Sequence, residues 1–299
     1  MFRYNSLNNY LKTRFGKKIY KLAVDCGFTC PNRDGTKGVG GCIFCSNGGS
    51  GEFAEKGTDI IKQLERAKHR IKNKTNDDTG YICYFQSFTN TYASVEYLKE
   101  LYFSALNFKG IEAISIATRP DCLQDDVLDL LEQLNNKIPV FVELGFQTSN
   151  QNSAKLINRC YDNDCFKTAV ERLNKINIEV VAHIIIGLPG ETVEDYINSV
   201  KYACSCGIKG IKLQLLHVLK NTGLAEMKYA PLTMEEYFFA IGECLKNIPP
   251  DVVIHRLTGD GDKKILIAPI WSADKHNVLN KLNEYLDKNT IVQGSALNG

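Results

Sequence analysis

Cysteines suited to metal chemistry gather in one short segment of this chain. Cys26, Cys30, Cys42 and Cys45 lie within twenty residues, in a segment rich in glycine. Thiolates are good ligands for zinc and iron, and glycines let a backbone wrap closely around a bulky group. Three interpretations compete: a structural zinc ion held by all four thiols, an iron–sulfur cluster held by three with one iron open, or free buried thiols.

The composition and the first residues bear on this choice. The chain has 299 residues, eleven cysteines and a formal net charge of +2, which by itself implies neither a nucleic-acid nor a membrane partner. The first residues contain no apolar signal segment, and no run is long enough for a membrane span. We therefore expect a cytoplasmic protein, where clustered cysteines more often bind metal or do chemistry than form disulfides.

The elements that must position these residues alternate regularly. Apolar strand-like runs cover residues 19–24, 81–85, 113–117, 140–144, 180–186 and 210–216. Helical patterns cover 59–71, 95–106, 127–134, 166–173 and 193–203. Strands separated by helices predict an α/β fold with a parallel sheet, either a barrel or partial barrel or an open doubly wound sheet. In a barrel, the chemistry would lie where strands end.

Both ends of the chain depart from this rhythm. Residues 1–21 carry six basic residues, five aromatics and no acidic residue, so 1–20 is predicted to be a basic arm. Such an arm suits RNA, although its aromatics could equally pack on the barrel and leave a solvated basic face. Residues 21–218 would form the barrel. Residues 219–299 would form an α+β extension covering its mouth, with a capping box at Thr233 and Glu236 and a strand at 252–255.

The segment Cys-Pro-Asn-Arg-Asp-Gly-Thr-x-Gly-x-Gly-Gly-Cys-x-Phe-Cys resembles the YhcC/YtqA-like family of radical SAM proteins, which is related to the elongator catalytic subunit and MiaB-type enzymes. The resemblance extends from about residue 10 to 297. It implies a partial (β/α)6 TIM-like barrel of the radical SAM type, in which Cys30, Cys42 and Cys45 hold a [4Fe–4S] cluster. Cys26 would lie outside the motif.

The same resemblance implies which residues contact the second cofactor, S-adenosylmethionine (SAM). Segments after the strands would meet its methionine, ribose and adenine parts. The Gly-Leu-Pro-Gly-Glu turn after the fifth strand is the strongest of these signals, because its backbone can approach a flat ring closely. The predicted SAM contacts are Gln86, Ser87, Glu143, Gln147, Arg159, Gly187, Pro189, Gly190 and Leu215. Gln86 and Ser87 replace the glycine-containing segment that the superfamily commonly has there.

Further polar residues are candidates for substrate contact. They are Arg119, Asp121, Lys212, His217, His255, Arg256 and Asp260. Arg119 and Asp121 belong to a Thr-Arg-Pro-Asp segment that resembles the elongator relatives, and an arginine there can bind a carboxylate or phosphate. The alternative for Arg119 is a salt bridge to Asp121. For Arg159 the alternative is a surface position, and His183 is interpreted as a core histidine.

The function that the resemblance implies is reductive cleavage of SAM to a 5′-deoxyadenosyl radical. An electron donor of the flavodoxin or ferredoxin type would be required. The related elongator enzymes point to tRNA as substrate, and the family resemblance points to maturation of the C5 side chain of the wobble uridine. The alternatives are a radical SAM enzyme acting on a small molecule or a protein, and a non-catalytic RNA-binding module that carries zinc or a cluster.

Overall fold

A single curved parallel sheet organises the molecule. The computed structural model describes residues 3–49, 54–259 and 261–297. Its strands are β1 (Ile19–Asp25), β2 (Glu55–Lys56), β3 (Gly80–Phe85), β4 (Ile111–Thr118), β5 (Val140–Gln147), β6 (Glu179–Ile186), β7 (Gly210–Leu215) and β9 (Val253–Arg256). They pair in the order β2-β1-β3-β4-β5-β6-β7-β9, and every pairing is parallel. The predicted partial barrel is confirmed.

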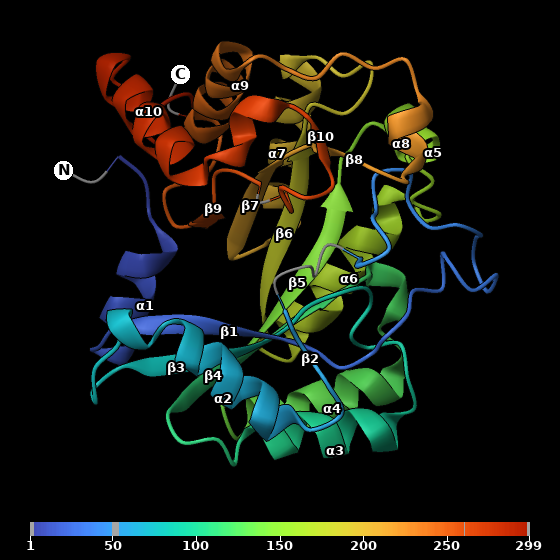
Figure 1. The fold of residues 1–299 in the computed structure, drawn as a ribbon, viewed down its shortest axis with the longest axis vertical. Coiled ribbons are helices and arrows are strands. Elements are labelled where there is room, and N and C mark those ends of the chain that lie inside the picture. Colours follow the sequence, from blue (N-terminus) through green and yellow to red (C-terminus); the bar gives the residue numbers. More distant parts are fainter. Residues whose placement is uncertain (1–2, 50–53, 260, 298–299) are drawn as a thin grey trace.

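Helices cover the outer face of this sheet (Figure 1). They are α2 (Ile60–Arg70), α3 (Val95–Ala105), α4 (Asp125–Asn135), α6 (Asn163–Lys175), α7 (Val193–Ser205), α9 (Met234–Lys246) and α10 (Lys275–Lys288), whereas the short helix α5 (Gln151–Leu156), which follows β5, lies outside this layer. The main hydrophobic core lies between the sheet and this layer, and it contains the apolar stripe of α4 that the sequence predicts. None of the helices in the described ranges combines the length and apolarity needed to cross a bilayer.

The C-terminal part extends the sheet rather than standing apart from it. The capping box predicted at Thr233 and Glu236 is present and opens α9. β9 then adds a parallel strand beside β7, with Lys212 and Arg256 as register partners. The short strands β8 (Val218–Leu219) and β10 (Leu266–Ala268) form a separate antiparallel pair, and the four-residue helix α8 (Gly223–Glu226) follows β8. The sheet therefore has two strands, β2 and β9, beyond the six repeated units.

The basic N-terminal segment folds onto the amino end of the barrel. Residues Leu7–Phe15 form helix α1, which Ser6 caps, and Leu11 packs against β1, β3, β4 and β5 residues. Arg14 pairs with Glu179 and Lys17 lies 2.6 Å from Glu112, at the starts of β6 and β4. Figure 1 shows α1 on the left and the blue loop that follows β1 on the right. The predicted basic arm therefore contains a packed helix, and three of its cations, Arg3, Arg14 and Lys17, are used in ion pairs.

Candidate active site

A cavity of ≈ 260 Å³ opens at the carboxyl ends of the barrel strands. It is bounded by the cysteine loop after β1, by the ends of β3 to β7, and by residues that follow β9. The predicted site residues that line it are Cys30, Cys42, Cys45, Gln86, Ser87, Arg119, Glu143, Gln147, Arg159, Lys212, Leu215, His217 and Arg256. The structure thus brings together residues spread over more than two hundred positions of the chain.

The three motif cysteines lie at one end of this cavity. Cys42 and Cys45 share a hydrogen bond that lowers the pKa of Cys42 to about 7; burial opposes this shift, and Arg119, Asn32 and Arg159 add to it. The pKa of Cys45 is raised well above its usual value by that bond, by burial and by the nearby Cys42 and Cys30. The site therefore favours a thiolate at Cys42, the form that binds metal.

Cys26 lies apart from the three motif cysteines. It packs at the edge of the main core, and burial raises its pKa to about 12, with Asp25 adding to the shift and a hydrogen bond to Gln63 opposing it. It is not among the residues that line the cavity. This position agrees with its expected place outside the cluster motif.

The number of thiols at the cavity bears on the choice between a zinc ion and a cluster. Over residues 3–49, 54–259 and 261–297, no group of three Cys, His, Asp or Glu side chains is arranged as a single-ion site. A structural zinc site uses four ligands on one ion, whereas a [4Fe–4S] cluster can be held by three thiolates with one iron open. Cys30, Cys42 and Cys45 line the cavity and Cys26 does not, which is the three-thiol arrangement.

Polar atoms without partners lie beside the cysteines. Ser87 and Thr89 are 3% and 1% exposed, both line the cavity, and neither hydroxyl has a hydrogen-bond partner among the described residues. The segment that carries Ser87 and Thr89 is anchored next to the cysteine segment, because the Thr89 N–H donates to the Thr29 carbonyl at 3.2 Å. Buried hydroxyls without partners are costly, so a polar ligand in this cavity would stabilise them. The residues present therefore fit both a cluster and a polar cofactor.

The segment at Ser87 adopts a glycine-type backbone although it contains no glycine. Ser87 and Phe88 have φ values of 83° and 56°. The Asn90 side-chain amide stabilises this turn by donating to the carbonyls of Ser87 at 3.0 Å and Ala117 at 2.8 Å. The chain therefore keeps the conformation for which glycine is ordinarily chosen.

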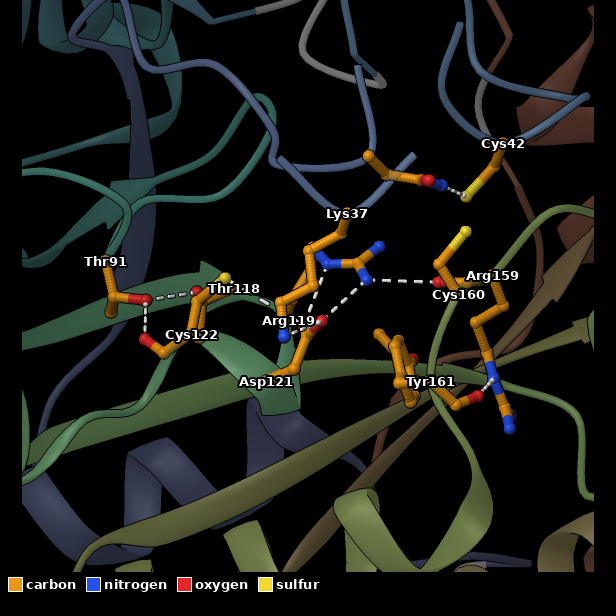
Figure 2. Close-up of polar contacts among 12 residues, drawn as sticks. Lys37, Cys42, Thr91, Thr118, Arg119, Asp121, Cys122, Arg159, Cys160 and Tyr161 are labelled. Carbon is orange, nitrogen blue, oxygen red and sulfur yellow. Dashed lines mark hydrogen bonds and ion pairs between the residues drawn. The ribbon is translucent and has the colours of Figure 1, made fainter. Parts of the chain in front are cut away.

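The two arginines near Cys42 are held by protein acceptors. Arg119 makes a bidentate pair with Asp121, 2.9 Å for each bond, and donates to the Arg159 carbonyl (Figure 2). Arg159 is 1% exposed and donates to four protein acceptors. The predicted alternative for Arg119, a salt bridge to Asp121, is the one observed, while the surface alternative for Arg159 is wrong. Both still place positive charge beside Cys42.

Glu143 is the centre of a buried network. Its carboxylate accepts from Lys21 Nζ at 2.5 Å, Tyr84 Oη at 2.9 Å and Ser115 Oγ at 2.8 Å, lies 2.8 Å from His183 Nε2, and also contacts Lys212. Burial alone would raise the pKa of Glu143, but Lys21, Lys212 and His183 hold it well below its usual value. Both carboxylate oxygens are already occupied, so Glu143 is bound to protein groups where a contact to SAM was expected.

Several predicted residues do not line the cavity. β6 contributes His183 and Ile185 to the lining, whereas Gly187, Pro189 and Gly190 lie beyond it along the chain. Asp121 is taken up by Arg119 and Lys37, and His255 packs against Gly210 and Phe141. Asp260 is outside the described residues. The roles predicted for these residues stay predictions.

Sequence reasoning missed several residues of the site. Lys21 was counted with the basic segment, but it lies in β1 and reaches Glu143. Tyr84, Ser115 and Tyr161 also belong to the site, and His183 is both a satisfied core histidine and a cavity residue. The available signal was a polar residue inside each apolar strand, which in a barrel indicates an inward-facing position.

Comparison with known proteins identifies related chains. A family model described as Radical SAM superfamily matches residues 30–203, and one described as Radical_SAM C-terminal domain matches 208–288. Protein YtqA of Bacillus subtilis is 44% identical over 297 residues, covering 98% of this chain and 92% of that one. Protein YhcC of Escherichia coli K12 is 35% identical over 298 residues, covering 98% and 95%.

Two more distant similarities are partial. A tRNA-2-methylthio-N(6)-dimethylallyladenosine synthase from Buchnera aphidicola is 27% identical over 147 residues, covering 48% of this chain and 29% of that one. The structure of Elp3 from Methanocaldococcus infernus superposes with a TM-score of 0.67 at 16% identity, covering 93% of this chain and 64% of that one. At that identity the likeness shows the fold.

Proposed function

This chain belongs to the radical SAM superfamily, within its YhcC/YtqA-like family, and from that premise we propose that it cleaves SAM reductively at a [4Fe–4S] cluster to modify tRNA. The observation that carries the proposal is the joint position, in one cavity, of three motif cysteines and two buried hydroxyls that have no partner in the part of the chain that the structure describes. The proposed modification is maturation of the C5 side chain of the wobble uridine.

Each group at the cysteine end of the cavity has a role in this proposal. Cys30, Cys42 and Cys45 hold the cluster, and Ser87 contacts the polar methionine end of SAM, beside Gln86. When bound, the cluster supplies the electron that breaks the bond between the SAM sulfur and its C5′ carbon. Arg119 and Arg159 stabilise the thiolate side of the cavity by their charge. The curved sheet and the segments that bound the cavity limit the access of water.

The division of the chain follows the same proposal. Residues 21–218 supply the barrel, residues 1–20 close its amino end, and residues 219–299 contribute Leu219, Arg256, Gly259 and Gly261 to the cavity. A one-electron donor of the flavodoxin or ferredoxin type would reduce the cluster. Gln147, Leu215 and the Gly187–Gly190 turn are proposed to complete the SAM site, and His217 to face the substrate.

Support for a tRNA substrate comes from relatives and from charge. A partial relative is named for a tRNA modification, and among the described residues the cavity lining contains the cations Arg33, Arg119, Arg159, Lys212 and Arg256 and the one carboxylate Glu143. A cationic cavity suits a nucleotide phosphate or an acidic base modification. The basic N-terminal segment gives this proposal little support, because Arg14 and Lys17 are paired with glutamates at the opposite end of the barrel.

The proposal is tested by comparing nucleosides from tRNA of strains with and without the gene. A wobble-uridine derivative should change in the deletion strain, be restored by the wild-type gene, and not be restored by a Cys42→Ala copy. Identical nucleoside profiles in all strains would reject tRNA and favour a small-molecule or protein substrate. A zinc-containing protein that binds RNA without cleaving SAM would instead support the non-catalytic alternative.

A further inference from the structure

One polar layer crosses the barrel below the cysteine end of the cavity. Each main strand places one polar side chain in it, and all of them contact Glu143 or one another except Arg256, which completes the row. In strand order they are Lys21, Tyr84, Ser115, Glu143, His183, Lys212 and Arg256. Glu143 is 0% exposed and is the only carboxylate among the described residues that line the cavity.

The charges of this layer do not balance. Lys21 and Lys212 both contact Glu143, so one carboxylate already faces two ammonium groups. His183 does not change this count, because burial and the charge of Lys212 lower its pKa to about 4. Arg256 adds a further cation from β9. An uncompensated cation in a buried site is costly, and the cost falls when an anion arrives.

Arg256 is placed to receive that anion. His183, Lys212 and Arg256 are successive register partners on β6, β7 and β9, so their side chains leave the same face of the sheet. Arg256 is half-buried and lines the cavity, and it makes no hydrogen bond or ion pair with any residue in the described ranges. By contrast, the guanidinium groups of Arg33, Arg119 and Arg159 donate to protein acceptors.

We propose that Arg256 and Lys212 form a subsite that binds an anionic group of the substrate, a carboxylate or a phosphate. A guanidinium binds either group through two parallel hydrogen bonds, and the Lys212 ammonium adds a point charge beside it. Glu143 then acts as the counter-ion that keeps Lys212 in place. The proposal rests on the proposed function, since the methionine carboxylate of SAM is assigned to the cysteine end of the same cavity.

The proposed subsite also bears on the protonation of Lys212. Burial, Lys21 and Arg256 lower its pKa to about 7, although Glu143 opposes the shift. A bound anion would favour the ammonium form and raise this pKa. The cavity lining runs from the cysteines to Lys212 and Arg256, so a ligand held here by its anionic group extends towards the cofactor end.

The test measures binding of two simple anions to the reconstituted protein. Dissociation constants for acetate and for inorganic phosphate are determined by NMR line broadening at constant ionic strength, for wild type, Arg256→Gln and Arg256→Lys. We expect Arg256→Gln to weaken the preferred anion about tenfold, and Arg256→Lys to retain part of the affinity. Lys99→Gln, on the exposed face of α3, is the matched control and should bind like wild type.

The comparison of acetate with phosphate distinguishes the possible sources of the anionic group. Tighter binding of acetate assigns a substrate carboxylate, and tighter binding of phosphate assigns a nucleotide phosphate. The proposal is overturned if wild type and Arg256→Gln bind the anions equally well, or if wild type binds neither acetate nor phosphate. So does a loss of SAM affinity equal to the loss of anion affinity, because the subsite would then hold the methionine carboxylate.

Failure of the proposed function would be recognised separately. Release of 5′-deoxyadenosine from SAM is measured on the wild-type protein alone, and its absence rejects reductive cleavage. The anion titration needs no electron donor, so it still decides whether Arg256 and Lys212 bind an anion.

Discussion

The two ends of the barrel use charge in opposite ways. At the amino end, Arg14 and Lys17 of the basic N-terminal segment lie against Glu179 and Glu112, and the ring of Phe141 lies under Arg14. At the carboxyl end, counting the described residues alone, the hydroxyls of Ser87 and Thr89 lack partners and the cations that line the cavity outnumber the carboxylates. Satisfied polar groups hold a fold together, whereas unsatisfied ones in a cavity indicate a ligand. A basic segment can therefore serve packing and ion pairing at the end of the barrel opposite to the cavity.

The largest effect is expected from the cluster cysteines. Replacing Cys30, Cys42 or Cys45 by alanine should remove the iron that reconstitution loads and reduce 5′-deoxyadenosine release to background, because each thiolate is expected to hold a separate iron. Cys26→Ala should keep both, since Cys26 packs away from the cavity. Iron analysis and product chromatography check this. Full iron content in Cys45→Ala, or its loss in Cys26→Ala, would reassign the ligands.

The next prediction compares the loss of one carboxylate from each end of the barrel. Glu143→Gln should lower the free energy of unfolding by about 3 kcal/mol or more, because it leaves Lys21 and Lys212 buried without their counter-ion. Glu179→Gln at the amino end should cost about 1 kcal/mol or less, since its side chain is 25% exposed against 0% for Glu143. Denaturant unfolding measures both. Equal losses of unfolding free energy in the two variants would show that the buried network around Glu143 stabilises the fold no more than the partly exposed ion pair of Glu179.

A smaller effect concerns pH. The pKa of Lys212 falls to about 7 in the folded protein, mainly through burial, against about 10.4 for an unfolded lysine. Between these values the unfolded chain binds the extra proton, so stability should rise with pH, by about 1 kcal/mol per unit above pH 7. Below pH 7 both states are protonated and this contribution is constant. Unfolding curves at pH 7, 8 and 9 should show a flatter rise in Lys212→Met; identical slopes would contradict the assignment.

The unpartnered hydroxyl at Ser87 should affect ligand binding and little else. Ser87→Ala should weaken SAM binding about threefold to tenfold while leaving stability within about 1 kcal/mol, because one hydrogen bond to the ligand is lost. Thr13→Ala, on the exposed face of α1, is the control from the other end. Calorimetric titration with SAM measures the difference. Unchanged affinity in Ser87→Ala would remove this residue from the cofactor site.

The smallest effect is expected from the basic helix. Lys12 and Lys18 are the exposed cations of the N-terminal segment without an ion pair in the described ranges. Replacing both by glutamine should change tRNA affinity by about twofold or less and leave its salt dependence nearly the same. Filter binding at several salt concentrations decides this. A large loss with a shallower salt slope would show that RNA also contacts the amino end.

The sheet was predictable because its signal is local. Each main strand is a short apolar run, and the observed strands extend the predicted ones by only a few residues, as in β5 at Val140–Gln147. The capping box at Thr233 is local too. The helix α1 was missed because its stability comes from Leu11 packing under the barrel and from ion pairs with distant glutamates. Such contacts leave no mark in a short window of sequence.

The site was predictable in part for the same reason. The cysteine spacing and the position of polar residues after strands place most of the lining correctly. The partners of those residues depend on distant chain segments. Glu143 stood out as a carboxylate in an apolar run, but its partners Lys21 and Lys212 lie 122 and 69 positions away. Sequence reasoning therefore found the residue but not the protein groups that it contacts, and its predicted contact to SAM stays a prediction.

Whether this chain cleaves SAM at a [4Fe–4S] cluster is decided by anaerobic reconstitution of the wild-type protein with iron and sulfide, followed by reduction in the presence of SAM. We expect a brown protein with about four irons per chain that releases 5′-deoxyadenosine. A colourless protein that retains zinc and leaves SAM intact would contradict it.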